Sequence, residues 1–369
     1  MEAGLYLHIP FCKSKCAYCD FASFAGQEQY MAAYTQAVLR EIRQKAKAYP
    51  FIIRTLFIGG GTPSVFPAKE MDTVLSALRR HFSFTDDAEC TCECNPGTVT
   101  EDFLSVLKKH GVNRLSFGAQ AAQPHLLRML GRIHTWEDVV SSVEMAKSMG
   151  FHNLNLDLML GLPGQTAEDV RETLLRALTL QPTHLSCYGL IVEEGTKMHA
   201  QVQKGLWQLP DEETERAEYA MCQDILAKHG FEQYEISNFS KPGFRCRHNW
   251  DCWQRVPYIG IGSAACGFVG AVRYQNPPDL SDYLQGMPAA EETISPEDAR
   301  FETMMLGLRT MEGVQEDAFY QMHGQPLSAV YGQKLQKPLQ EGLIHWEGGR
   351  VFLTREGMNL LNRILLEIM

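Results

Sequence analysis

The sequence predicts an α/β fold: an open, partial (β/α)6 barrel followed by a C-terminal α+β region that includes a winged-helix-like domain. Short apolar segments alternate with stretches of helical period up to about residue 200, which is typical of repeated strand–helix units and a parallel sheet. The strands alternate apolar and polar residues, so each has one apolar and one polar face. After residue 200 the strand–helix alternation ends, and helical patterns and a hairpin-like pattern follow.

The barrel elements follow one another in a regular order. Strands are expected at 4–9, 54–58, 89–95, 113–119, 153–160 and 184–192, and helices near 27–48, 67–82, 100–110, 135–150 and 166–180. In the fifth strand Leu154, Leu156 and Leu158 share one face, while Asn155 and Asp157 share the other. A closed eight-stranded barrel fills its interior with branched aliphatic side chains. Polar inner faces therefore predict an open barrel with a binding cavity as its lumen. The alternative is a sheet with one solvent-facing side, which is rare for parallel strands.

We expect three domains, at 1–200 (barrel), 201–290 (barrel extension) and 291–369 (helical, winged-helix-like). An acidic helix near 211–229 precedes a strand-like stretch at 231–239, and residues 342–354 have the pattern of a hairpin. Winged-helix domains often bind DNA, but residues 300–369 carry 7 basic and 8 acidic residues. This balance favours a lid or a protein-contact role.

Composition narrows the function classes. The chain of 369 residues has 34 basic and 44 acidic residues and a net charge of -10, which argues against nucleic acid or an anionic membrane as partner. It has neither a signal-peptide pattern nor an apolar run of about 18 residues that would predict a transmembrane segment. The 11 cysteines do not form the even, dense framework of a small secreted domain. We therefore expect a cytoplasmic protein whose cysteines serve metal binding, catalysis or packing.

The strongest chemical signal is the loop Cys12-Lys-Ser-Lys-Cys16-Ala-Tyr-Cys19, directly after the first strand. Three thiolates within eight residues can hold one iron–sulfur cluster. The next cysteine is Cys90, so one iron would stay open to another ligand. Structural zinc with His8 as fourth ligand is an alternative, but zinc sites use other spacings. A disulfide does not suit a reducing compartment.

A glycine-rich turn, Gly59-Gly60-Gly61-Thr62-Pro63-Ser64, follows the second strand. Consecutive glycines let backbone approach a ligand closely, although a loose turn would have the same composition. It is neither a P-loop nor a GxGxxG motif. Together with the cysteine loop it resembles the radical S-adenosylmethionine enzymes. That resemblance implies a [4Fe-4S] cluster whose open iron binds S-adenosylmethionine, with the glycine turn at its amino group. The reduced cluster then cleaves the sulfonium to a 5'-deoxyadenosyl radical.

Further motifs resemble the oxygen-independent coproporphyrinogen III oxidase family along nearly the whole chain. They include Tyr6-Leu-His-Ile-Pro-Phe-Cys12, Asn113-Arg-Leu-Ser-Phe-Gly-Ala-Gln120, Gly131-Arg-Ile-His134, Gly161-Leu-Pro-Gly164 and His184-Leu-Ser-Cys-Tyr188. By motif position, the resemblance implies that S-adenosylmethionine is contacted by Tyr6, Tyr18, Gly60, Gly61, Thr62, Glu93, Gln120, Arg132 and Asp157. The alternation of the strands independently places Tyr6, Glu93, Gln120 and Asp157 on polar faces.

Two departures point to one branch of this family. The oxidases have a further cysteine after the third, where this chain has Asp20-Phe21, and they have a long extension before the motif at Tyr6. Both departures resemble the HemW-type haem chaperones. That branch implies haem as cargo, a recipient haem protein such as a respiratory enzyme, an electron donor such as a flavodoxin or ferredoxin, and no coproporphyrinogen decarboxylation. We assign no catalytic residue and leave enzymatic activity open. The oxidase reaction is the alternative, and a winged-helix regulator with a redox-sensing cluster is disfavoured by charge.

The segment Cys246-Arg-His248-Asn249-Trp-Asp-Cys252-Trp253 resembles the HNxxYW motif of that branch, with Cys252 in place of the tyrosine. The resemblance implies His248 as axial haem ligand, Trp253 against the porphyrin and Arg247 near a propionate. The alternative is that these residues only seal the lower cavity. For the remaining cysteines, including Cys90, Cys92 and Cys94 on one strand face, we expect packing roles.

Overall fold

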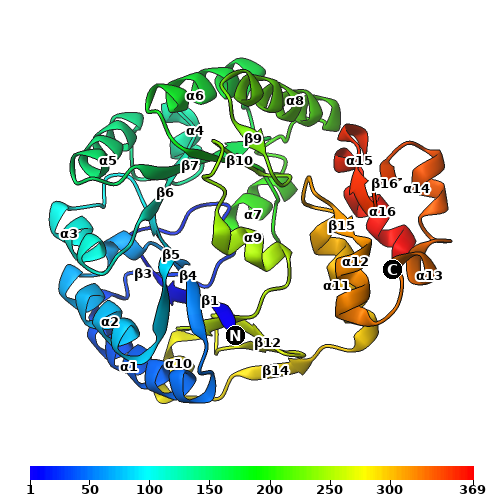
Figure 1. The fold of residues 1–369 in the computed structure, drawn as a ribbon. Helices are drawn as coiled ribbons and strands as arrows, with labels where there is room; N and C mark the ends of the chain where they lie inside the picture. The colour runs from blue at the N-terminus through cyan, green and yellow to red at the C-terminus, as the bar shows by residue number, and fades with distance from the viewer.

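The computed structural model describes residues 1–369, and its centre is one twelve-stranded sheet that curves into an open barrel (Figure 1). Its strand order is β14-β13-β12-β11-β1-β4-β5-β6-β7-β8-β10-β9. The strands β11, β1, β4, β5, β6, β7 and β8 run parallel. The bounds in this sheet are β1 Glu2–Ile9, β4 Ile52–Gly60, β5 Ser83–Cys94, β6 Arg114–Gln120, β7 Asn153–Leu160, β8 His184–Gly189, β9 Glu232–Gln233, β10 Asn238–Ser240, β11 Tyr258–Ile261, β12 Cys266–Val269, β13 Val272–Gln275 and β14 Ala290–Thr293.

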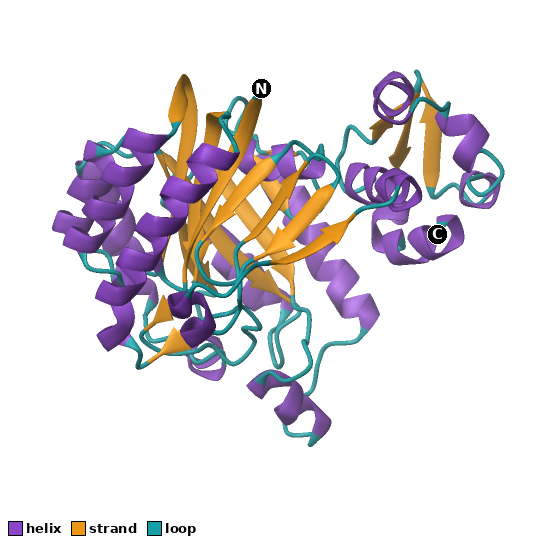
Figure 2. Cartoon of the chain, turned by 90° about the horizontal axis from the view of Figure 1, so that it is seen from below, coloured by secondary structure: helices purple, strands orange, loops and turns teal.

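Helices cover the outer face of the parallel strands (Figures 1 and 2). We call the region to which the side chains of the inner face point the lumen. The helices up to the end of the barrel are α1 Met31–Ala48, α2 Ala68–His81, α3 Glu101–Lys109, α4 Pro124–Met129, α5 Trp136–Ser148, α6 Ala167–Thr179, α7 Lys197–Gln203, α8 Glu212–Lys228, α9 Arg247–Trp253 and α10 Leu280–Gln285. The short strands β2 Phe11–Cys12 and β3 Phe24–Ala25 pair beside the barrel, and 3-10 turns occupy Glu28–Tyr30 and Pro63–Val65.

Local signals explain where the covering helices begin. Thr135 and Thr166 open α5 and α6 with capping boxes, in which the threonine accepts from the third helical N–H and the aspartate there accepts from the threonine N–H. Thr100 caps α3 through the N–H of Phe103. The five barrel helices expected from the sequence are therefore all present, with ends within a few residues of the expected ones.

The apolar strand face packs on the helices, as the alternation predicts. Leu5, Leu7 and Ile9 of β1 are fully buried and belong to the main hydrophobic core. Cys90, Cys92 and Cys94 of β5 lie in the same core, which confirms their packing role. Cys187 and Cys222 are buried there too, whereas Cys266 on β12 is only half-buried and is not a core residue.

The sheet is larger than the six strands expected. β11 adds a seventh parallel strand beside β1, and antiparallel strands extend both edges. The predicted strand at 184–192 ends at Gly189, and the stretch 231–239 divides into β9 and β10. β11 has four residues, one of them Gly260, and is too short to show a clear period of two.

The C-terminal residues form a separate small core beside the barrel (Figure 2). Its helices are α11 Pro296–Gly307, α12 Glu316–His323, α13 Leu327–Tyr331, α14 Gln336–Gln340, α15 Arg355–Asn359 and α16 Leu361–Ile368, and its strands are β15 Val314–Gln315, β16 Ile344–Glu347 and β17 Arg350–Leu353. The strands form one sheet in the order β15-β17-β16, and β16 and β17 are the predicted hairpin. The helices in this structure are all too short or too polar to cross a lipid bilayer.

Candidate functional site

The cysteine loop leaves the C-terminal end of β1 and lies at the mouth of the lumen. Cys12, Cys16 and Cys19 are all partly exposed and unpaired. Backbone bonds from Ala17 N to Leu130 O and from Met198 N to Ala17 O, both 2.8 Å, hold the loop against the barrel rim. The loop is thus fixed at its centre while its sulfurs stay accessible.

Each thiol has a polar neighbour near its sulfur. Thr62 Oγ1 donates to Cys12 Sγ at 3.4 Å, Arg132 Nη1 donates to Cys16 Sγ at 3.5 Å, and Ser23 Oγ lies 3.9 Å from Cys19 Sγ. The hydroxyl of Thr62 favours the thiolate form of Cys12, and that of Ser23 the thiolate form of Cys19. Burial nevertheless raises the pKa of the Cys12 and Cys19 thiols. Binding of a metal would therefore release their protons.

These residues fit an iron–sulfur cluster. A cluster takes one thiolate on each of several irons, so its cysteines need not converge on one point. The structure indeed has no group of three His, Cys, Asp or Glu side chains placed to hold a single ion. Gly61 approaches the loop so closely that a Cβ there would lie 2.8 Å from Phe11 O and 3.0 Å from Cys12 Sγ. The glycine turn and the cysteine loop are therefore packed as one unit.

The glycine turn at the end of β4 faces the carboxylate of Glu93 on β5. Gly60 N donates to Glu93 Oε2 at 3.2 Å. Gly60 has a φ of +112°, and a Cβ there would lie 2.6 Å from the ring of His8. The hydroxyl of Tyr6 is 3.0 Å from His8 Nδ1. Tyr6, Gly60 and Glu93 thus lie on the three adjacent strands β1, β4 and β5.

Arg132 links the cysteine loop to Asn95, which follows β5, and to Gly118 on β6. Its Nη2 donates to Asn95 Oδ1 at 2.5 Å and to Gly118 O at 2.6 Å, while its Nη1 reaches Cys16. Burial raises the pKa of the Tyr18 hydroxyl, and the charge of the neighbouring Arg132 opposes this shift. Gln120 is buried at the end of β6 and has a φ of +65°, a strained conformation for a residue with a side chain.

Asp157 lies on β7, beside Ser116 of β6. Its carboxylate accepts from Ser116 Oγ at 3.0 Å and from Asn155 Nδ2 at 2.8 Å. The structure therefore brings together, around the upper lumen, the nine residues that the resemblance assigns to S-adenosylmethionine, which are Tyr6, Tyr18, Gly60, Gly61, Thr62, Glu93, Gln120, Arg132 and Asp157.

The charge of Asp157 acts on the buried carboxylate of Glu93. Burial, and then the charge of Asp157, raises the pKa of Glu93 to about 8, although the Gly60 N–H and the Arg114 charge oppose this shift. Glu93 is thus mostly protonated at neutral pH. Arg114 is a lumen residue that motif reasoning did not assign. It is 2% exposed, and its only signal was its position on the polar face of β6.

The candidate haem segment forms α9, at the opposite end of the lumen. His248 is 6% exposed, with Nδ1 2.9 Å from Thr55 Oγ1 and its ring stacked on Phe57 at 5.2 Å. Burial, and then the charge of Arg114, lowers the pKa of His248 to about 4, so the ring is neutral. Its Nε2 makes no hydrogen bond within the chain.

The structure does not gather the three predicted haem residues around one point. The Arg247 guanidinium pairs with Asp87 at 3.1 Å, and Trp253 stacks on Arg309 at 4.8 Å. His248 and Trp253 are five residues apart on a helix, so they point in different directions. Of this predicted set only His248 faces the lumen.

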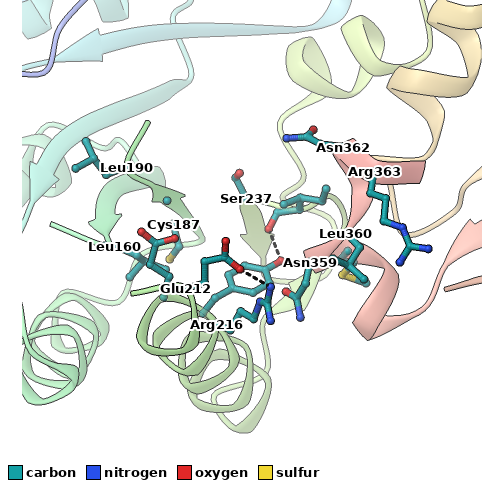
Figure 3. A pocket seen from close by; sticks show the side chains of 16 residues that line it. Leu160, Cys187, Leu190, Glu212, Arg216, Ser237, Asn359, Leu360, Asn362 and Arg363 are labelled. Carbon is teal, nitrogen blue, oxygen red and sulfur yellow. Dashed lines mark hydrogen bonds and ion pairs between the residues drawn. The ribbon is translucent and has the colours of Figure 1, made fainter. Parts of the chain in front are cut away.

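A separate cleft of about 520 Å³ lies between the barrel rim and the C-terminal region (Figure 3). The barrel contributes Leu160, Cys187 and Leu190, and the C-terminal helices contribute Asn359 and Arg363. Arg216 at its edge pairs with Glu212 at 2.9 Å. The predicted site residues do not line this cleft.

Fold and cysteine loop together define a radical S-adenosylmethionine protein. The profile of the Radical SAM superfamily matches residues 6–177, and that of the HemN C-terminal domain matches residues 294–360. The solved structure of coproporphyrinogen III oxidase (HemN) from Escherichia coli superposes with a TM-score of 0.87 over 99% of this chain and 89% of its own, at 23% identity. At that identity the likeness shows the shared fold alone.

Sequence relatives identify the branch. The Bacillus subtilis protein named Heme chaperone HemW is 37% identical, with 97% of each chain covered. The Escherichia coli K12 protein of the same name is 33% identical over 98% of this chain and 97% of its own. A mouse protein named Radical S-adenosyl methionine domain-containing protein 1, mitochondrial, is 31% identical and also matches along the whole chain. This chain belongs to the HemW haem chaperone family.

Proposed function

We propose that this protein is a cytoplasmic radical S-adenosylmethionine haem chaperone, which binds haem and delivers it to a recipient haem protein. The observation that carries the proposal is the similarity along 97% of the chain to proteins named haem chaperones. The cysteine loop supports it, because Asp20-Phe21 stands where the oxidases have another cysteine.

The cofactors we propose are a [4Fe-4S] cluster on Cys12, Cys16 and Cys19, and S-adenosylmethionine beside it. When bound, the cluster supplies an electron and an open iron. The chain itself would orient the cofactor: Gly60 and Glu93 face its amino group, and the Arg132 guanidinium places positive charge near the loop. The electron donor we propose is a small carrier such as a flavodoxin or ferredoxin, and the recipient a haem protein, for instance a respiratory one. The acidic balance of the chain speaks against nucleic acid as a partner.

His248 is the residue we propose as haem ligand. Its neutral ring and its Nε2, which makes no hydrogen bond, suit an axial ligand. Arg247 and Trp253, whose side chains are engaged by Asp87 and Arg309, are less suited to their predicted roles. His248 is buried, so haem coordination by this residue would require the end of the lumen at α9 to open.

Anaerobic incubation with haem, and separately with coproporphyrinogen, tests the proposal. The cluster-loaded protein should bind haem and leave coproporphyrinogen unchanged in the presence of a reductant and S-adenosylmethionine. The fate of the tetrapyrrole and of S-adenosylmethionine is followed by absorbance and mass spectrometry. Conversion of coproporphyrinogen would overturn the chaperone proposal in favour of the oxidase reaction.

A further inference from the structure

A continuous chain of hydrogen bonds runs through the lumen from the start of α9 to the carboxylate of Asp157. Cys246 N donates to the Tyr234 hydroxyl at 3.3 Å, and that hydroxyl lies 2.8 Å from His184 Nε2. On the other side of the ring, His184 Nδ1 lies 2.6 Å from Asn155 Oδ1. Asn155 Nδ2 then donates to Asp157 Oδ1 at 2.8 Å.

The two ends of this chain fix the direction of every bond in it. A backbone N–H can only donate and a carboxylate only accepts. Asn155 donates through Nδ2 to Asp157 and, at 2.7 Å, to Ser116 Oγ, so its Oδ1 accepts the proton of His184 Nδ1. His184 Nε2 must then accept from the Tyr234 hydroxyl. Every donor points toward Asp157, and such aligned bonds strengthen one another.

A neutral imidazole is essential to this arrangement, since it has one donor and one acceptor. His184 is 0% exposed, and burial, followed by the charge of Arg114, holds its pKa well below the ordinary value. A protonated ring would donate at both nitrogens and turn the Tyr234 hydroxyl away. Burial raises the pKa of Asp157, and its hydrogen bonds from Asn155 and Ser116 and then the charge of Arg114 oppose this shift and stabilise the carboxylate as an acceptor. The surroundings of His184 therefore favour the directed chain.

We propose that His184 and Tyr234 are positioning residues for S-adenosylmethionine, because they orient the Asp157 carboxylate and keep it an acceptor at the cofactor. Neither residue needs to touch the cofactor. The inference rests on the proposed function, in which Asp157 contacts S-adenosylmethionine. It also connects the cofactor site to α9: Tyr234 receives its bond from Cys246, the residue before Arg247 and the haem candidate His248.

The test is Tyr234→Phe, with Tyr219→Phe as matched control. The Tyr219 hydroxyl donates to Ile236 O at 2.7 Å and has no bond to the chain described above, so both variants lose one internal hydroxyl. S-adenosylmethionine binding to the anaerobically reconstituted proteins is measured by calorimetry. We expect the dissociation constant to rise about tenfold in Tyr234→Phe, the effect of one hydrogen bond. Tyr219→Phe should stay within about twofold of wild type.

A second readout follows the ring itself. In ¹⁵N-histidine-labelled protein, His184 should carry its proton on Nδ1, and Tyr234→Phe should weaken that preference. Should Tyr234→Phe fail to fold, His184→Gln and His184→Leu replace it: the amide of Gln can both donate and accept, so it should retain more affinity than Leu. Equal affinities in each pair, or an Nε2-protonated ring in wild type, overturn this inference. Wild-type protein that binds no S-adenosylmethionine overturns the proposed function as well.

Discussion

Glu93→Gln is the most informative change at the proposed cofactor site. The carboxyl group of Glu93 accepts from Gly60 N at 3.2 Å, and a glutamine oxygen can keep that bond while the ability to ionise is lost. Glu93 faces the carboxylate of Asp157, the charge of Arg114 and the hydroxyl of Tyr6. With a pKa of about 8, it is uncharged in most molecules at pH 7.

Entry of S-adenosylmethionine, whose sulfonium group is a permanent cation, should favour the ionised form of Glu93. At pH 7 a group with a pKa of about 8 is protonated in about ten of eleven molecules, so binding should release about 0.9 proton. The affinity for S-adenosylmethionine should then rise about tenfold from pH 6 to pH 7, because the competent, ionised fraction rises about tenfold. Above this range the amino group of the ligand itself titrates, at about pH 7.7–8.

The assay is calorimetry in buffers of different ionisation enthalpy, which counts protons directly. The cluster is reconstituted first, so the three loop cysteines are already deprotonated. Glu93→Gln should release about 0.9 proton fewer than wild type at pH 7, because any proton lost from the ligand's own amino group is lost in both proteins, and its affinity should depend less on pH. Glu215→Gln, on the exposed face of α8 beside the 520 Å³ cleft, should behave as wild type. Proton release below about 0.2 in wild type, or undiminished release in Glu93→Gln, would refute the reasoning.

Three further predictions concern the cluster, the glycine turn and haem. Replacement of any one of Cys12, Cys16 and Cys19 by serine should remove the whole cluster, with about four irons lost together in an iron assay. Cys94→Ala should retain the cluster. Stoichiometric zinc in the wild-type protein would contradict this prediction. Gly60→Ala should lower the free energy of unfolding by at least ~1 kcal/mol, because Gly60 has a φ of +112° and lies against the His8 ring. Urea titration measures this change. An unchanged urea midpoint of unfolding would contradict the strain at this turn. His248→Ala should shift the haem absorbance spectrum and Arg247→Ala should not; identical spectra would remove His248 as ligand.

Alternation along the strands predicted most of the barrel. Polar residues such as Asn155 and Asp157 identified the lumen face. β11 was missed because it has four residues and pairs with β1, some 250 positions earlier in the chain. Such a pairing depends on the path of the intervening chain and has no local signal.

The proposed S-adenosylmethionine site could be predicted because its residues lie in contiguous motifs. The chain from Tyr234 through His184 to Asp157 could not, since it depends on the registers of β6, β7 and β8 and on the return of the chain at β10. Motif spacing also could not show that Trp253 points away from His248. That follows from the helical conformation of α9, in which positions five apart do not share a face.

The central claim is that this chain carries haem for another protein. The most direct test measures transfer of haem to another protein. The reconstituted protein is loaded with haem, and unbound haem is removed. The loaded protein is then mixed anaerobically with a haem-free acceptor protein, with and without S-adenosylmethionine. The account predicts that the haem absorbance moves to the acceptor, and that this protein returns to its haem-free state with its cluster intact. Haem that stays on the chain, or reaches the acceptor no faster than free haem does, would contradict it.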